Sequence, residues 1–129
     1  MKYLFPGPEK LVNADFQGIG LTKARIATIN HLSAAVMDGR VSFQASTDPH
    51  QLRKSLLDIK GVGEWTAQYI LMRTIKHPDA IPCSDLGLLK AVSSDGKPAP
   101  EKQLKEMSLP WKPWRAYAAM HLWSSLADV

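Results

Sequence analysis

The sequence predicts an all-α protein, and three observations support that prediction. Apolar residues recur at intervals of three and four in one segment after another, as on the buried face of a helix. Prolines and glycines divide the chain into helix-sized pieces. No run of useful length alternates apolar and polar residues in the manner of a half-buried strand. A chain of 129 residues is enough for one domain with a modest core, so we expect residues 1–129 to form a single domain.

The first half of the chain is expected to form three helices. They are predicted at residues 8–12, 22–38 and 48–59. Pro8 suits the first turn of a helix, and Thr22 and Asp48 suit the N-cap position, where a side-chain oxygen accepts a backbone hydrogen bond. Gly39 follows the second helix and is typical of a C-cap. Residues 41–47 are predicted to form a loop, with a brief strand as the alternative.

The second half is expected to form four more helices. They are predicted at residues 65–75, 85–92, 100–107 and 115–126. The first of these should stop before Pro78, because a proline disfavours helical geometry in the residue that precedes it. Residues 93–100 are mostly polar and predict a loop.

Composition and charge exclude some classes of function but do not identify the function. The net charge is +4, which permits a polyanionic partner but does not require one. Cys83 is the only cysteine, so an intramolecular disulfide and a cysteine-based metal or iron–sulfur cluster are excluded. No apolar run approaches the ~20 residues that a membrane helix needs, and residues 1–8 lack the apolar centre of a signal peptide. We therefore expect a cytoplasmic protein without a membrane partner.

Residues 56–67 join two of the expected helices through a glycine turn. Such a turn can expose several backbone amides at a helix N-terminus, where the helix dipole favours an anion such as a DNA phosphate. Ile59 should face inward and leave the amides outward. The predicted phosphate-binding residues are Lys60, Gly61, Val62 and Gly63. A tight turn whose glycines serve only packing is the alternative.

Asp85 begins the helix predicted at residues 85–92. Its local sequence favours an ordinary N-cap. If it instead borders a cleft beside the hairpin helix, the dipole would keep its carboxylate ionised for chemistry. Three aromatic residues, Trp65, Tyr69 and Trp123, could line a pocket that stacks a flat, electron-poor base, although burial in the core is the alternative for each.

Three segments together resemble the helix-hairpin-helix DNA glycosylase superfamily, in particular its alkylbase branch, DNA-3-methyladenine glycosylase II. They are the run 57–67, Asp85 twenty residues after Trp65, and the closing segment 111–123. Residues 20–25 are similar to the segment before the hairpin, so the resemblance covers nearly the whole chain. It implies a monofunctional hydrolase that cleaves the N-glycosidic bond of alkylated purines of the 3-methyladenine type in base excision repair.

The resemblance implies a role for each matching residue. Asp85 would stabilise the sugar as the N-glycosidic bond breaks and would help water attack C1′. Trp65 stands where relatives that cleave the strand place a lysine, so no Schiff base could form. Trp65, Tyr69 and Trp123 would hold the flipped damaged base of a double-stranded DNA, and the amides of residues 61–63 would grip a phosphate.

No cofactor is required by the resemblance, but relatives hold a monovalent or divalent cation on hairpin carbonyls. The carbonyls at the matching positions of this chain are those of Leu57, Ile59 and Val62.

The chain departs from the family at its beginning. Relatives carry an N-terminal sheet domain and two opening helices before the segment that matches residues 1–20. We therefore expect an N-terminally truncated, partial domain whose helices at 22–38 and 115–126 expose apolar faces to a homodimer or partner chain. Three other functions stay open: a non-catalytic DNA-binding remnant, one half of a split glycosylase, and a hairpin scaffold.

Overall fold

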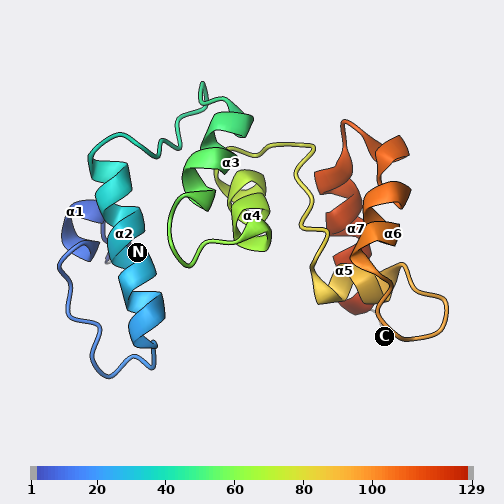
Figure 1. The fold of residues 1–129 in the computed structure, drawn as a ribbon, viewed down its shortest axis with the longest axis horizontal. Coiled ribbons are helices and arrows are strands. Elements are labelled where there is room, and N and C mark those ends of the chain that lie inside the picture. The colour runs from blue at the N-terminus through green and yellow to red at the C-terminus, as the bar shows by residue number, and fades with distance from the viewer. Residues whose placement is uncertain (1–2, 128–129) are drawn as a thin grey trace. The chain divides into compact units, whose positions relative to one another are not determined.

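The structure, a computed structural model, describes residues 3–127, and every regular element in that range is helical. The elements in chain order are α1 (Pro8–Leu11), α2 (Lys23–Met37), α3 (Pro49–Leu57), α4 (Glu64–Thr74), α5 (Leu86–Ala91), α6 (Glu101–Met107), the 3-10 helix η1 (Leu109–Trp111) and α7 (Arg115–Ala127) (Figure 1). The predicted all-α class is confirmed, and each of the seven predicted helices is present. Only the short η1 was not predicted.

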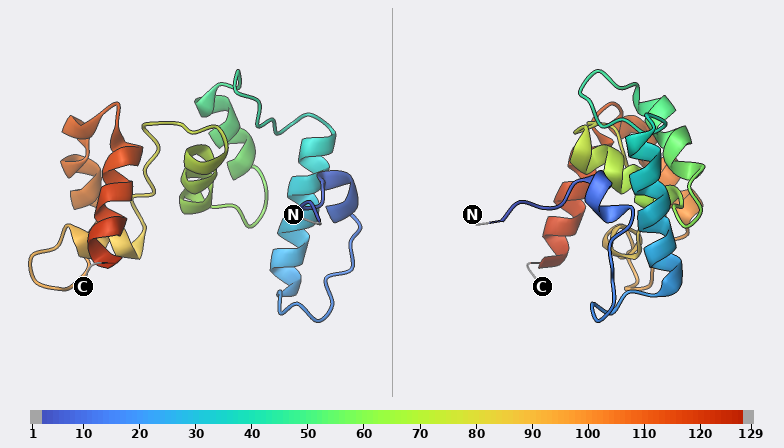
Figure 2. Two further views of the ribbon diagram at one scale, coloured as in Figure 1. Left: turned by 180° about the vertical axis from the view of Figure 1, so that it is seen from behind. Right: turned by 90° about the vertical axis from the view of Figure 1, so that its left-hand side faces the viewer.

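The chain divides into two compact units, Met1–Gly63 and Glu64–Val129. In the first unit α1 packs along α2, as the views of Figure 2 also show. Thr22 caps α2 by accepting a hydrogen bond from the amide of Arg25 at 3.2 Å. Asp48 caps α3 through the amide of His50 at 3.3 Å. Both predicted N-caps are confirmed, because a cap depends on local sequence.

The turn after α3 is fastened to α2 by Thr28. Its hydroxyl lies 3.0 Å from the carbonyl oxygens of both Ala24 and Lys60. Gly61 follows in the left-handed region at φ +96°, and a Cβ at this position would collide with the hydroxyl of Thr28. Residue 61 must therefore be glycine for two independent reasons, its φ and the close approach of α2.

The core of the first unit is formed mainly by α3 and its flanking segments. Leu52 and Leu56 of α3 are fully buried, and Val41 of the preceding loop and Ile59 of the following turn are buried with them. Leu57, the last residue of α3, is only half-buried. The apolar residues of α2 are also half-buried at best, apart from Ala35.

In the second unit α5 packs against α7 (Figure 1). The N-terminus of α7 is fixed to the segment after α4 by the guanidinium of Arg115, whose Nε and Nη2 donate to the two oxygens of Asp79 at 2.8 and 2.7 Å. The amide of Ala116 also donates to the carbonyl of Pro78 at 2.9 Å. This two-pronged ion pair determines where α7 begins relative to α4.

Replacement of Asp79 by Asn should destabilise the second unit by about 2 kcal/mol at neutral pH, the typical value for a hydrogen bond to a charged group. The hydrogen bonds from Arg115 lower the pKa of Asp79. A carboxyl group with a lowered pKa stabilises the folded state at pH values above its ordinary pKa. This stabilisation is lost as the pH falls through the lowered pKa. Urea unfolding of the wild type and Asp79→Asn should therefore converge on acidification. A difference in the free energy of unfolding between the two proteins that stays constant with pH would contradict the ion pair.

Candidate active site

The carboxylate of Asp85 receives hydrogen bonds from three elements of the second unit. Asp85 is the N-cap of α5, and its Oδ1 accepts from the amide of Leu88 at 2.9 Å. The same oxygen accepts from the indole Nε1 of Trp123 on α7 at 2.8 Å. Its Oδ2 accepts from the indole Nε1 of Trp65 on α4 at 2.8 Å. The carboxylate is therefore both a helix cap and the meeting point of α4, α5 and α7.

Gly87 makes room for this arrangement. A Cβ on residue 87 would lie 3.0 Å from Oδ1 of Asp85 and 3.4 Å from the side chains of Leu126 and Trp123. Its φ is not in the left-handed region, so its role is space rather than backbone freedom. The absence of a side chain there lets α7 bring its indole within reach of the carboxylate.

The electrostatics of the site favour the ionised form of Asp85. Burial acts to raise its pKa, but hydrogen bonds from the indoles of Trp123 and Trp65 and from the amides of Leu88 and Gly87 outweigh burial, and the pKa is lowered. The donors that hold the carboxylate are all uncharged. Its negative charge is consequently fixed in position without being neutralised by a counter-ion.

Aromatic rings form a wall beside the carboxylate. Trp65 and Tyr69 stack with centroids 5.0 Å apart and planes at 9°, and Tyr69 meets Trp123 edge-on at 6.2 Å. The guanidinium of Arg73 lies 5.3 Å from the centroid of Tyr69. These residues, with Asp85 and Met120, line an open cleft of about 520 Å³.

The structure brings the predicted residues Asp85, Trp65, Tyr69 and Trp123 together at one site. Sequence reasoning treated the two indoles only as stacking surfaces and did not anticipate that their N–H groups hold the carboxylate. It also missed Arg73 and Met120. Arg73 lies four residues after Tyr69 and Met120 three residues before Trp123, so helical spacing alone could have placed them on the same faces.

The glycine hairpin presents fewer amides than the sequence suggested. The amide of Val62 donates to the carbonyl of Ile59 at 3.0 Å, and the side chains of both residues are buried, as predicted for Ile59. The amides of Gly61 and Gly63 have no hydrogen-bond partner within residues 3–127. A Cβ on Gly63 would meet nothing within 4 Å, and the side chain of Lys60 is exposed. The hairpin thus offers two open amides beside one lysine.

Other kinds of site find little support in the part of the chain that the structure describes. There, no group of three or more His, Cys, Asp or Glu side chains could hold a metal ion. Cys83 is partly buried, and burial raises the pKa of its thiol. None of the helices between residues 3 and 127 has the length and apolar character to cross a bilayer.

The helical fold, the glycine hairpin and the indole-held carboxylate define a protein of the helix-hairpin-helix class. The chain is 42% identical over 126 residues to the probable bifunctional transcriptional activator/DNA repair enzyme AlkA of Mycobacterium tuberculosis, and 33% identical over 122 residues to DNA-3-methyladenine glycosylase 2 of Escherichia coli. It belongs to the alkylbase family of helix-hairpin-helix DNA glycosylases. No family model matches it.

The match covers most of this chain but only part of each relative. The two alignments cover 98% and 92% of this chain, and 25% and 42% of the respective relatives. Among solved structures, the 3-methyladenine DNA glycosylase Mag1 of Schizosaccharomyces pombe, in complex with abasic DNA, has a TM-score of 0.84 at 25% identity. That superposition covers 97% of this chain and 66% of Mag1.

Replacement of Trp65 by Phe should raise the pKa of Asp85 relative to the wild type, because it removes one donor to the charged carboxylate and keeps an aromatic ring. The carboxyl 13C shift followed through an NMR titration measures that change. Tyr69→Phe is the matched control, because the side-chain donors to Asp85 are the indoles of Trp65 and Trp123 and not the hydroxyl of Tyr69. An identical titration of Asp85 in wild type and Trp65→Phe would show that the indole does not hold the carboxylate.

Proposed function

We propose that this chain is the core of a monofunctional DNA glycosylase that hydrolyses the N-glycosidic bond of alkylated purines of the 3-methyladenine type in base excision repair. The observation that supports it most is the ionised carboxylate of Asp85, held between two indole donors beside an aromatic cleft. The names of its relatives agree with this chemistry. If the source is bacterial, the protein acts in the cytoplasm on nucleoid DNA.

The carboxylate suits the transition state of this reaction. As the bond between C1′ and the base nitrogen breaks, the base leaves with the electron pair and the sugar becomes oxocarbenium-like. A fixed negative charge stabilises that cation strongly in a site that partly excludes water. Asp85 would supply this charge and orient the water that bonds to C1′. Its uncharged donors matter here, because a cationic partner would cancel the field that the sugar needs.

The aromatic cleft suits an alkylated purine. N-alkylation leaves the purine positively charged, so aromatic faces attract it, and its bond to the sugar is already weakened. Tyr69 stacks on Trp65 and lies under the guanidinium of Arg73, so it supports the wall. Trp65 is 38% exposed and, with Trp123, would contact the flipped base. The tryptophan at position 65 has no amine that could form a Schiff base, which favours hydrolysis without strand cleavage.

The hairpin would hold the DNA backbone. Mag1, the structural neighbour, is in complex with abasic DNA. In this chain the open amides of Gly61 and Gly63 and the ammonium of Lys60 would bind a phosphate of double-stranded DNA. A monovalent or divalent cation would sit on the carbonyls of Leu57, Ile59 and Val62. These are hard oxygen ligands, and the Ile59 carbonyl keeps one lone pair beyond its bond to Val62.

Apolar exposure on α7 favours a partner surface as part of this function. Tyr117 is 60% exposed and Met120 is 41% exposed, together with Leu126 near the end of the helix. A homodimer or a partner chain would cover such a face. A non-catalytic DNA-binding remnant or one half of a split glycosylase is the alternative, and the release of free base decides between them.

Asp85→Asn should lower the release of free base from alkylated duplex DNA by roughly a thousandfold, the scale of losing a group aimed at developing charge. The affinity for an undamaged duplex should change little, because the substitution preserves the shape of the side chain. Chromatography of released 3-methyladenine provides the measurement. If the wild type releases none while both proteins bind duplex equally, the enzyme assignment fails and the binding remnant stands.

Gly63→Asp should weaken duplex binding at least tenfold, because it places an anion beside the amides that would face a phosphate. The fold should survive, since a side chain at position 63 meets open space. Gly63→Asn adds the same bulk without the charge and is the control. Fluorescence anisotropy of a labelled duplex compares the three proteins, and equal affinities would remove the hairpin from the interface.

A further inference from the structure

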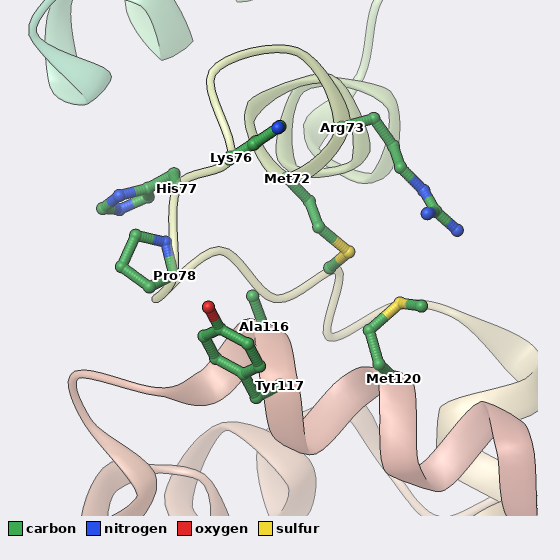
Figure 3. A pocket seen from close by; sticks show the side chains of 8 residues that line it. All are labelled: Met72, Arg73, Lys76, His77, Pro78, Ala116, Tyr117 and Met120. Carbon is green, nitrogen blue, oxygen red and sulfur yellow. The ribbon is translucent and has the colours of Figure 1, made fainter. Parts of the chain in front are cut away.

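The guanidinium of Arg73 places a positive charge in the cleft of Asp85. Arg73 lies in the last turn of α4, is exposed and lines this cleft. It also lines a neighbouring cavity of about 230 Å³, and Figure 3 shows its side chain extending away from the ribbon of α4 there. Within residues 3–127 the guanidinium forms no ion pair with a carboxylate. The cleft therefore contains a cation whose charge no carboxylate neutralises.

One row of side chains on α4 leads from the carboxylate of Asp85 to this cation. Trp65, Tyr69 and Arg73 are spaced four residues apart, so they lie on the same face of the helix. The indole of Trp65 donates to Asp85 at 2.8 Å and stacks on Tyr69 with centroids 5.0 Å apart. The guanidinium lies 5.3 Å from the centroid of Tyr69. Eight residues of helix span about 12 Å, so the negative and positive charges stand at opposite ends of one aromatic wall.

The proposed reaction moves a positive charge through this cleft. N-alkylation places that charge on the base. When the bond between C1′ and the base nitrogen breaks, its electron pair passes to the base, which leaves neutral, and the sugar becomes oxocarbenium-like. Water then bonds to C1′ and loses a proton to the solvent. Because C1′ has to face Asp85, the base extends along the wall toward Arg73, and the positive charge moves away from the guanidinium and toward the carboxylate.

We propose that Arg73 is a specificity-determining residue of this cleft, which repels the positive charge of an alkylated base and so favours its departure as a neutral base. This role rests on the proposed function. The repulsion is greatest in the bound substrate and smaller in the transition state, where part of the charge has moved to the sugar. Arg73 therefore weakens the binding of a cationic base and speeds its release.

Arg73→Met provides the test, because it removes the charge and keeps a long side chain beside the ring of Tyr69. The variant should bind a duplex that contains 7-methylguanine about fivefold more tightly than the wild type does, because the repulsion is gone. A 2′-fluoro sugar at the lesion slows cleavage during the binding measurement. In a single turnover on alkylated duplex DNA, the variant should release 3-methyladenine about fivefold more slowly. Loss of packing alone would not tighten binding while slowing release.

A neutral lesion of the same shape isolates the effect of charge. The base 7-deaza-7-methylguanine has the outline of 7-methylguanine without its positive charge, so wild type and Arg73→Met should bind its duplex equally. Arg73→Lys keeps a cation at this position and should retain the wild-type ratio of affinities for the two duplexes. Lys97→Met removes one charge from the loop between α5 and α6, outside the cleft, and is the control for net charge.

The outcomes separate this role of Arg73 from the proposed function. If the wild type releases base and Arg73→Met binds both duplexes more weakly by the same factor, with a lower salt dependence, Arg73 contacts a phosphate and the proposed role is overturned. Equal affinities and equal rates in the two proteins overturn it as well. In both cases the glycosylase stands. If the wild type releases no base from alkylated duplex DNA, the proposed function fails and the role of Arg73 fails with it.

Discussion

The carboxylate of Asp85 draws its donors from α4, α5 and α7, and the second unit is arranged so that those donors converge. A charged oxygen removed from water needs hydrogen bonds to remain ionised, and here each oxygen has at least one. Neutral indoles supply two of these hydrogen bonds, so the negative charge is stabilised without being neutralised by a cation. The fold and the chemistry therefore share one requirement: α7 must approach α5 closely enough for Trp123 to reach its acceptor.

Two contacts away from the carboxylate satisfy that requirement. The ion pair of Arg115 with Asp79 fixes the beginning of α7, and Gly87 leaves space where the helix passes α5. Leu88, one position further, is fully buried and ties α5 to the core. The site is thus positioned by rigid elements at both ends of α7.

The sequence predicted the helices and their caps well, because Thr22, Asp48 and Asp85 act on amides two or three residues away. It predicted which aromatic residues gather but not the direction of their indole N–H groups, which depends on helices distant in sequence. The same limit explains Val62, whose amide donates to the carbonyl of Ile59 instead of facing outward. Local signals specify elements, whereas pairings between elements depend on packing.

The contact between Thr28 and Gly61 has a consequence for how this protein can vary. A smaller residue at position 28 would remove the steric barrier at position 61, yet the φ of +96° would still select glycine. A change at position 28 would also remove the hydrogen bond from its hydroxyl to the carbonyl of Lys60, so it would loosen the turn without allowing another residue at position 61. An engineer who wishes to alter the hairpin should vary α2 and leave the glycine untouched.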